Sequence, residues 1–318
     1  MHKNIKIVGT GRAPAKTFVD NDALSTFLET DYAWIVGKTG IKTRAILIEE
    51  TLTDKAAEAA QKALEAAQKT LNARPPDLVL CATIGGDYAT PALACCLAER
   101  LGLSCPAFDL NAACTGFVYG LDVADAYIRA GKAETILLVC AEKMSRLVDW
   151  TDRATCILFG DGAAACVITA GSALRYIRIG CDPSTALLNA PNTGGYRDAG
   201  TAPALRMMGP EVYKFAVRTI EHEIDAALSA LDIAAEDIDY FLLHQANARI
   251  VEGARARLKL PAAKFPTNIL RYGNMSAASI PVLLDELCET GIIEKNQTLM
   301  FIGFGAGMTV GTAVMRWE

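Results

Sequence analysis

The chain has 318 residues, 52% of them hydrophobic and 21% charged, and its formal net charge is −5. So many apolar residues with so few charges exclude a chain that is disordered throughout. The acidic balance gives no electrostatic reason to expect nucleic-acid binding, and the length predicts two domains or one large one.

Strand-like and helix-like segments alternate along the first half of the chain. The opening IKIVGTG predicts a strand, and residues 51–73 predict an alanine-rich helix that Pro75 and Pro76 end. There follow the strand PDLVLCAT, a helix over 91–101, a strand near CPAFDL, a helix over about 113–130 and the strand ETILLVCAE. Apolar strands alternating with helices predict an α/β fold whose strands are buried on both faces. The expected buried face of the alanine-rich helix carries Ala57, Ala60, Leu64, Ala67 and Leu71.

Residues 299–315 carry no charge, and their length approaches that of a transmembrane helix. Four glycines interrupt this segment, and β-branched residues flank them. We therefore predict a strand, a glycine-rich turn and a second strand, and no membrane span.

The ten cysteines and three histidines limit the possible chemistry. Most cysteines lie in apolar runs and no two CxxC pairs are present, so we expect nine of them to be packing residues and predict no metal site. The opening MHKNIKIVGTG lacks the apolar core of a signal peptide, which with so many thiols predicts a cytoplasmic location.

The two halves of the chain are related in sequence. Residues 77–80 resemble residues 239–242 at an offset of 162, and each group follows a predicted helix. Independently, residues 132–137 resemble residues 295–300 at an offset of 163. Two matches at nearly one offset predict a duplicated α/β unit.

The predicted halves are residues 1–172 and 173–318. Under this pairing Cys114 corresponds to about position 276, and both positions are strand-to-helix junctions. The side chains that could carry chemistry therefore lie at strand ends and helix starts, facing the junction between the halves.

The segment DLNAACTGFVYGL places Cys114 in the first turn of a helix, after a strand. The helix dipole and free N–H groups there favour a thiolate and lower the thiol pKa, as a nucleophile for acyl transfer requires. A buried structural cysteine at a tight helix start is the alternative.

His244 ends the strand YFLLH and is followed by the polar residues Gln245, Asn247 and Arg249. A polar run directly after a buried strand indicates a cleft, although a lone histidine at a strand end can also be structural. His222 has acidic neighbours on a helix and is interpreted as solvated surface, and His2 is terminal.

Asn274 stands before a helix start rich in small residues. Its amide could donate hydrogen bonds to a carbonyl oxygen, or it could simply cap the helix. The glycines of GFGAG, residues 303–307, let backbone N–H groups point into a site and could supply half of an oxyanion hole.

Several ordered motifs run through nearly the whole chain with fitting spacing: DYAWIVGKTGIKTR (31–44), CPAFDLNAACTGF (105–117), DWTDRATCILFGDGAAA (149–165), HQANAR (244–249), GNMSAAS (273–279) and GFGAGMTVGTAV (303–314). Together they resemble the β-ketoacyl-acyl-carrier-protein synthase III family of the thiolase-like superfamily. The resemblance implies a five-layered αβαβα fold of two pseudo-twofold related halves, a homodimer, and no metal or prosthetic group.

The resemblance implies a catalytic set of Cys114, His244 and Asn274, with backbone N–H groups of Cys114 and Ala306 holding the oxyanion. An acyl-CoA would acylate Cys114, and malonyl-acyl carrier protein would then lose CO₂ and condense with the acyl group. Coenzyme A would be held by Trp34, Lys38, Thr39 and Arg153. Carrier-protein docking would use Gln245, Ala246, Asn247, Ala248 and Arg249, with Lys214 and Arg257 as further candidates.

Three positions depart from the family pattern. Ala306 replaces the middle glycine of three, which puts the oxyanion geometry in question because alanine disfavours positive φ. Lys38 stands where an arginine commonly packs near the nucleotide. Thr90 stands where many relatives carry Phe at the acyl pocket, so we expect a deeper pocket and a longer or branched primer.

Two other functions fit the sequence. A related condensing or acyltransfer enzyme of secondary metabolism would carry the same Cys-His-Asn set, and dependence on carrier protein would separate the two. A non-catalytic acyl-binding partner subunit is a rival of another class, against which the intact set argues.

Overall fold

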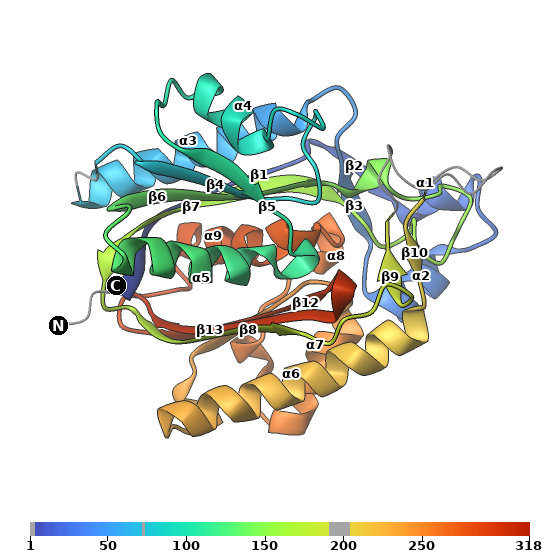
Figure 1. Cartoon of the computed structure of the whole chain (residues 1–318). Helices are drawn as coiled ribbons and strands as arrows, with labels where there is room; N and C mark the ends of the chain where they lie inside the picture. Colours follow the sequence, from blue (N-terminus) through green and yellow to red (C-terminus); the bar gives the residue numbers. More distant parts are fainter. Residues whose placement is uncertain (1–3, 72–73, 191–203) are drawn as a thin grey trace.

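The computed structural model describes residues 4–71, 74–190 and 204–318, and these fold into five alternating layers of helix and sheet (Figure 1). The first sheet has the strand order β1-β7-β6-β4-β5. Its strands are β1 (Asn4–Pro14), β4 (Leu78–Ala82), β5 (Ala107–Leu110), β6 (Thr135–Lys143) and β7 (Asp161–Gly171).

The second sheet has the order β11-β12-β13-β8 and repeats the pairing of the first. Its strands are β8 (Leu174–Cys181), β11 (Tyr240–Leu243), β12 (Thr298–Gly305) and β13 (Thr309–Arg316). The pair β11/β12 is parallel, as is β4/β6, and β12/β13 and β13/β8 are antiparallel, as are β6/β7 and β1/β7.

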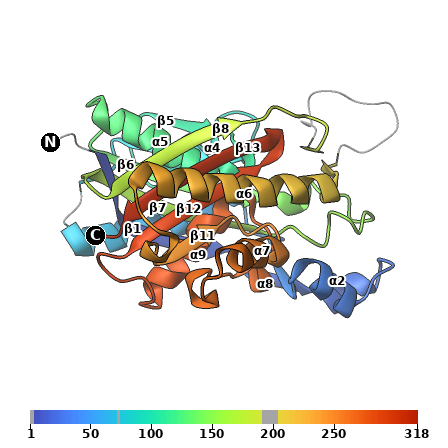
Figure 2. The same ribbon diagram turned by 90° about the horizontal axis from the view of Figure 1, so that it is seen from below.

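Helices fill the three other layers (Figures 1 and 2). The layer outside the first sheet holds α3 (Leu52–Leu71) and α4 (Leu93–Arg100), and the layer between the sheets holds α5 (Gly116–Arg129) and α9 (Ser279–Glu289). The layer outside the second sheet holds α6 (Gly209–Leu231) and α7 (Ala248–Leu258).

Smaller elements flank the layers. They are β2 (Thr17–Asp20) paired with β3 (Thr43–Ile46), β9 (Leu188–Asn189) paired with β10 (Arg206–Met207), and the short helices α1 (Asn21–Ser25), α2 (Tyr32–Thr39) and α8 (Ile269–Tyr272). Single 3₁₀ turns are η1 (Ala113–Thr115), η2 (Met144–Arg146), η3 (Ala235–Asp237), η4 (Ala262–Lys264), η5 (Ser276–Ala278) and η6 (Ala306–Met308).

The two halves share hydrogen bonds and backbone angles at equivalent positions, in agreement with the duplication predicted from the sequence. Asp77 accepts a backbone hydrogen bond from Thr135, and Asp239 accepts the equivalent one from Thr298. Ala113 and Ser276, which open η1 and η5, have φ of 46° and 48°. The division at 172/173 stays a prediction; β7 ends and β8 begins on either side of it.

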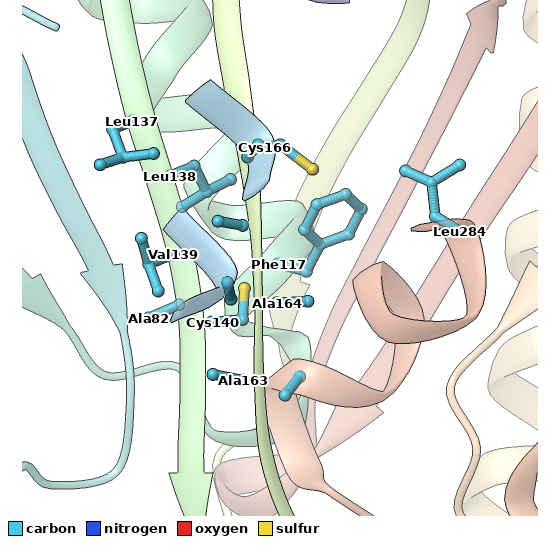
Figure 3. Packing of buried hydrophobic residues seen from close by; sticks show 14 of the residues in the cluster. Ala82, Phe117, Leu137, Leu138, Val139, Cys140, Ala163, Ala164, Cys166 and Leu284 are labelled. Carbon is cyan, nitrogen blue, oxygen red and sulfur yellow. The ribbon is translucent and has the colours of Figure 1, made fainter. Parts of the chain in front are cut away.

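One part of the hydrophobic core lies where the first sheet meets the helices between the sheets (Figure 3). Phe117 of α5, Leu284 of α9 and Ala163 and Ala164 of β7 belong to one buried cluster there. Phe117 also packs edge-on against Phe301 of β12, with ring centroids 5.5 Å apart, so one side chain ties the two sheets together.

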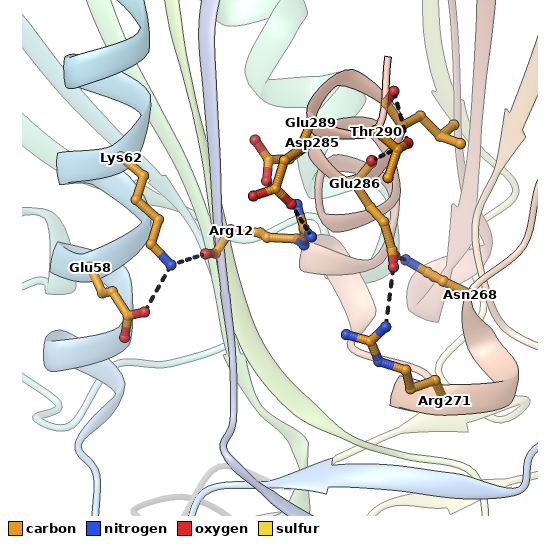
Figure 4. A network of polar contacts seen from close by, with 10 residues as sticks. Arg12, Glu58, Lys62, Asn268, Arg271, Asp285, Glu286, Glu289 and Thr290 are labelled. Atoms are coloured by element: carbon orange, nitrogen blue, oxygen red, sulfur yellow. Dashed lines mark hydrogen bonds and ion pairs between the residues drawn. The ribbon is translucent and has the colours of Figure 1, made fainter. Parts of the chain in front are cut away.

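Arg12 of β1 fastens the first sheet to helices on both of its faces (Figure 4). Its carbonyl oxygen accepts a hydrogen bond from Lys62 of α3 at 2.9 Å. Its guanidinium donates to Asp285 at 2.7 Å and to Glu289 at 2.5 Å, both on α9. Because Arg12 and Asp285 are mostly buried, this contact is screened less than a surface pair.

Three expectations need correction or completion. Of the face predicted for α3, Ala60 and Ala67 are buried, Ala57 and Leu64 are half-buried, and the side chain of Leu71 lies outside the described residues. The buried side also includes Leu52, Lys55, Ala56, Ala59 and Ala63, so the face predicted from the sequence is rotated. The expectation of packing cysteines is wrong for Cys95 and Cys181, which are exposed. Within the described residues no helix is long and apolar enough to cross a membrane, and residues 299–315 fall in β12, η6 and β13, as predicted.

Replacing Gly9 of β1 by alanine is expected to destabilise the protein by about 2 to 3 kcal/mol. The added Cβ would lie 2.3 Å from the carbonyl oxygen of Ala63 in α3, and backbone cannot move aside as a side-chain end can. Urea unfolding measures the loss. The matched control is Gly253→Ala within α7, where nothing lies within 4 Å and helix propensity predicts a small gain. Equal midpoints for Gly9→Ala and the unchanged protein would contradict this packing argument.

Candidate active site

Cys114 lies at the junction between β5 and α5, inside η1. The positive φ of Ala113 turns the chain sharply there, and the side chain of Cys114 is 6% exposed. Gly305, at the end of β12, lies against it: a Cβ on Gly305 would be 2.9 Å from both the backbone N and the Cβ of Cys114. Only glycine fits at this position of β12.

The thiol of Cys114 is not acidified, contrary to the prediction from its place at a helix start. Burial raises its pKa to about 12, and the charge of Glu142 acts in the same direction. The Ser276 hydroxyl acts to lower this pKa but does not offset burial. The resting residue is therefore a thiol whose proton must be removed during any nucleophilic attack.

His244 follows β11 and is 1% exposed. Its backbone N–H donates to Ile302 of β12 at 2.8 Å, and its ring packs edge-on against Phe304 with centroids 5.2 Å apart. Burial lowers the pKa of His244 to about 3, so the imidazole is neutral at physiological pH. A neutral imidazole can donate one hydrogen bond without carrying charge.

Asn274 is held by its backbone and its side chain together. Its N–H donates to Leu158, and its carbonyl accepts from Gly160, so it lies against the segment that enters β7. Its side-chain Oδ1 accepts from the N–H of Ser276 at 2.8 Å. This bond uses Oδ1 as the acceptor and fixes the orientation of the amide, so Nδ2 is the atom that can donate. The geometry is compatible with both a structural role and a hydrogen-bond donor role for Asn274.

The glycine-rich segment turns without strain at Ala306. Positive φ falls on Gly307 (74°) and Met308 (51°), and Ala306 is not among the described residues with positive φ. The Thr309 hydroxyl donates to the Ala306 carbonyl at 3.2 Å and lies 3.0 Å from the Thr115 hydroxyl. These threonines hold η6 beside η1, so the departure at this position does not disturb the local backbone.

The structure brings together the four predicted central residues. Cys114 contacts the end of β12, His244 bonds to the same strand, and Ala306 directly follows it. Asn274 joins them because its side chain is bonded to the N–H of Ser276, which opens η5, and η5 packs against η1, the turn that holds Cys114. They meet where β11 and β12 end and the two pseudo-equivalent turns η1 and η5 approach each other.

Of the four residues expected to hold coenzyme A, three are at least partly accessible and one is buried. The guanidinium of Arg153 lies over the ring of Trp34, 5.1 Å from its centroid, and Lys38 is exposed nearby on the same helix as Trp34. Thr39 is wrong as a direct contact: it is 2% exposed, and its hydroxyl donates to Ile35 and accepts from Ile41. Both hydrogen bonds are local contacts at the C-terminal end of α2.

The residues expected to dock carrier protein also differ in accessibility. Arg249 is exposed at the start of α7, with its guanidinium 5.9 Å from the ring centroid of Tyr213. Gln245 is wrong as a docking contact, because it is 1% exposed, donates to Leu243 and accepts from Asn268.

The remaining docking candidates are at least partly accessible. Asn247 caps α7 and donates to the Lys38 carbonyl, which ties this helix to α2, while Ala246 and Ala248 are half-buried beside it. Lys214 pairs with Glu211, and Arg257 pairs with Asp225.

The family model described as 3-oxoacyl-[acyl-carrier-protein (ACP)] synthase III matches residues 108–182. A second model, described as the C-terminal part of the same synthase, matches residues 228–317. The β-ketoacyl-[acyl-carrier-protein] synthase III of Clostridium acetobutylicum is 38% identical over 329 residues, covering 99% of this chain and 99% of that relative. That of Xanthomonas campestris pv. campestris is 40% identical over 319 residues, covering 98% of both. The chain belongs to the β-ketoacyl-[acyl-carrier-protein] synthase III family.

Solved structures agree with this assignment. The 3-oxoacyl-[acyl-carrier-protein] synthase III of Aquifex aeolicus VF5 superposes with a TM-score of 0.91 at 38% identity, covering 98% of this chain and 100% of that one. The priming β-ketosynthase of the R1128 polyketide pathway also superposes, with a TM-score of 0.92 at 29% identity, covering 100% and 97%. The thiolase-like fold and the resemblance are thus confirmed, and the protein is a condensing acyltransferase of fatty acid biosynthesis.

Two residues of this synthase's site were not selected from the sequence. Glu142 is a buried carboxyl near the end of β6, and Ser276 is a buried hydroxyl in η5. The only sequence signal for Glu142 was a single acidic residue at the end of the apolar run TILLVCAE. Ser276 was noted only as the counterpart of Cys114.

The loop that carries Thr90 is held at its start, after β4. Arg146 donates to the carbonyl oxygens of Gly85 and Gly86, and Asp87 accepts from the first N–H groups of α3. Thr90 itself is exposed.

In the described part of the chain, no group of three or more His, Cys, Asp or Glu side chains could hold a metal ion.

Proposed function

We propose that this synthase forms an acyl-enzyme on Cys114 from an acyl-CoA and then condenses the acyl group with malonyl-acyl carrier protein. The observation that carries the proposal is the convergence of Cys114, His244, Asn274 and the η6 turn at the ends of β11 and β12. Sγ of Cys114 attacks the thioester carbonyl carbon, and coenzyme A leaves. The N–H groups of Cys114 and Ala306 are the proposed donors to the oxyanion.

His244 and Asn274 act in the second half-reaction. A neutral imidazole and an amide oriented by Ser276 can each donate a hydrogen bond to the malonyl thioester carbonyl. They stabilise the enolate that forms as CO₂ leaves, and its carbon attacks acyl-Cys114 to give the β-ketoacyl product. Two substrates that react through one covalent intermediate predict ping-pong kinetics. We expect no metal or prosthetic group to take part.

Mass spectrometry after mixing the protein with acyl-CoA tests this proposal. An acyl mass on wild-type protein is the expected result. A protein that gains no acyl mass from any acyl-CoA tried would favour the non-catalytic acyl-binding role. Condensation with acceptors other than malonyl-acyl carrier protein would favour the enzyme of secondary metabolism, whose fold the polyketide relative shares.

The adenine of coenzyme A is proposed to lie between Trp34 and Arg153. The guanidinium faces the ring at 5.1 Å, so adenine would enter by separating the two groups and contacting both, and exposed Lys38 supplies charge for the phosphates.

Charge reversal at Arg249 is expected to raise KM for malonyl-acyl carrier protein about tenfold or more without slowing acylation by acyl-CoA. Arg249 is an exposed cation at the start of α7, and carrier protein is the only substrate large enough to reach across that surface while its thioester enters the site. Steady-state kinetics at two ionic strengths measures the change. Lys69→Glu is the matched control, because Lys69 is exposed on α3, in the outer layer on the opposite side of the molecule from α7 (Figure 1). Equal losses with both substrates would argue against docking at Arg249.

Thr90 is proposed to admit a primer longer or more branched than acetyl. The side chain is small and exposed on a loop anchored by Arg146 and Asp87, so it can cap the acyl pocket of a second copy. Thr90→Phe is expected to shift the preference toward acetyl-CoA, as measured by kcat/KM across acyl-CoAs of rising length. A strict acetyl preference in the wild-type enzyme would contradict the hypothesis.

The synthase is further proposed to be a cytoplasmic homodimer. Strand β5 is an edge strand whose four residues are half-buried, and an unpaired edge of this kind can pair with a second copy. All ten thiols are free, as in a reducing compartment. Light scattering in solution measures the mass of the assembly.

A further inference from the structure

A cavity of about 980 Å³ lies at the end of the two sheets that is remote from Cys114. Parts of β1, α3, β8 and the end of β13 form its walls, and the C-terminus lies at this end of the molecule (Figure 1). Lys295 and Asn296 line it just before β12 begins at Thr298, whereas Gly305, at the other end of β12, lies against Cys114. At roughly 3.3 Å per residue, β12 separates the two places by about 23 Å. The cavity is therefore separate from the catalytic site.

The cavity carries an excess of positive charge. Among its described lining residues Glu318 is the only acidic one, and four are cationic: Lys6, Arg175, Lys295 and Arg316. With the α-carboxylate of residue 318 also counted, an excess of two positive charges remains. The whole chain has a formal net charge of −5, so cations are concentrated here against the overall balance. A concave site of this sign attracts anions.

Three of these cations have no partner within the chain. Across residues 4–71, 74–190 and 204–318, no ion pair or side-chain hydrogen bond involves Arg175, Lys295 or Arg316, and all three are exposed. The carboxylate of Glu318 is already engaged by Lys6, at 3.4 Å. Like charges that gather in one hollow repel one another, and an anion placed between them removes that cost.

The neutral polar groups of the cavity add further donors. Trp317 is half-buried, and its indole N–H, which can only donate, has no acceptor in the described part of the chain. The N–H of Asn296 donates to the Trp317 carbonyl at 2.7 Å, and the N–H of Trp317 donates to the Gln297 carbonyl at 2.7 Å. These two bonds tie the segment before β12 to the end of β13, so Lys295 and Arg316 stand on one wall.

The strand that lines the cavity favours a compact ligand over an extended peptide. β1 is an edge strand of the first sheet, and a regular free edge could pair with an added strand. Its ladder with β7, however, shifts register between Ile7 and Gly9, within the lining segment. A bulge of this kind bends the edge and interrupts its pattern of hydrogen-bonding groups. The volume also lies within the range of about 300–1,000 Å³ that is typical of small-molecule sites.

We propose that this cavity binds a small molecule that carries a chain of two or three phosphate groups. A nucleoside triphosphate and inorganic tripolyphosphate are two sources of that chemistry. Arg175, Lys295 and Arg316 hold the phosphates, since a guanidinium can bind two phosphate oxygens at once and an ammonium acts as a point charge. A nucleoside would add contact with the indole of Trp317, the aromatic side chain of the described lining. The proposal does not depend on the reaction at Cys114.

Lysine footprinting by mass spectrometry locates the ligand without relying on activity. The full-length enzyme is labelled with an amine-reactive ester at rising concentrations of ATP or of tripolyphosphate, without Mg²⁺. Both probes are expected to protect Lys295 and Lys6, each with a saturable midpoint that rises with ionic strength. Lys38 lies beside the proposed adenine site, so its protection reports ATP bound there and separates the two sites.

A double variant removes charge from the cavity and keeps the reporter lysine. Arg175→Gln combined with Arg316→Gln is expected to raise the midpoint for protection of Lys295 about tenfold or more. Lys259→Gln is the matched control: it removes an exposed cation, without a partner in the described chain, from the end of α7 and outside the cavity lining. It should keep the wild-type midpoint. Both variants should form acyl-Cys114 at the wild-type rate.

Equal midpoints for the wild type and the double variant would overturn the proposal. So would protection of Lys38 alone, which would place the nucleotide at the catalytic site, or the lack of saturable protection of Lys295 by either probe. A midpoint for ATP well below that for tripolyphosphate would support the proposal with a nucleoside as the source. Equal midpoints for the two probes would support it with the phosphate chain as the whole recognised group.

Discussion

The Cys114→Ala variant is expected to form no acyl-enzyme and to lose condensation activity by about 10⁴-fold or more. The side chain supplies the only atom that the proposed reaction bonds to the acyl group. The loss should not come from unfolding, since alanine removes only a sulfur from a position that is already tightly packed. Mass spectrometry with acyl-CoA and the unfolding midpoint together measure both effects.

Cys288→Ala is the matched control for that variant. Cys288 is another free cysteine, half-buried on α9, and its loss should leave the adduct unchanged. An acyl mass that persists in Cys114→Ala and disappears in another cysteine variant would place the nucleophile elsewhere.

The pH dependence of alkylation measures whether the Cys114 thiol is ionised in the resting enzyme. Because burial raises the pKa of Cys114 to about 12, about one thiol in 10,000 is ionised at pH 8. Alkylation of Cys114 by iodoacetamide should therefore be slow and should rise about tenfold per pH unit between pH 8 and 10. A rate that is already level at pH 8 would mean that a thiolate is present in the resting enzyme.

Asn274→Asp is expected to slow decarboxylation of malonyl-acyl carrier protein by about 100-fold to 1,000-fold while leaving acylation of Cys114 in place. Aspartate keeps the shape of asparagine and can still accept from the N–H of Ser276, but it loses the Nδ2 donor and adds a negative charge where an enolate forms. Release of CO₂ and formation of acyl-Cys114 are measured separately.

His244→Ala should show the same separation of the two half-reactions, because a neutral imidazole is proposed to donate to the same carbonyl oxygen. His244→Gln, which keeps an amide donor, should recover part of the decarboxylation rate. Equal losses in both half-reactions for the Asn274 and His244 variants would indicate a structural role instead of a role in enolate stabilisation.

Much of this architecture could be predicted from local sequence. The strand and helix order of the first half, the turn between β12 and β13 and the duplicated unit all depend on short patterns of apolar, glycine and proline residues. Cys114 could be placed at a strand-to-helix junction for the same reason. Such patterns act over a few neighbouring residues, so they can be read without knowing what packs against them.

The motif residues show where that information ends. Gln245 and Thr39 stand among functional neighbours in the sequence, yet both are buried and their polar atoms are engaged by the backbone. Arg249 and Lys38, only a few positions away, are exposed. Which member of a polar run faces the site depends on where neighbouring strands and helices pack.

The protonation states of the site were decided only by the tertiary structure. The sequence placed a cysteine at a helix start, which by itself favours a thiolate, but the enclosing layers bury the thiol and raise its pKa. Glu142 and Ser276 lie 134 positions apart in the chain and both influence the pKa of that thiol only because η5 packs against β6 and η1. The sequence alone determined the fold class and the identity of the reactive groups, since both follow from local patterns and residue chemistry. Desolvation and charge depend on every group that surrounds a site, so the acidity of those groups and the partners they use were set by the packed fold.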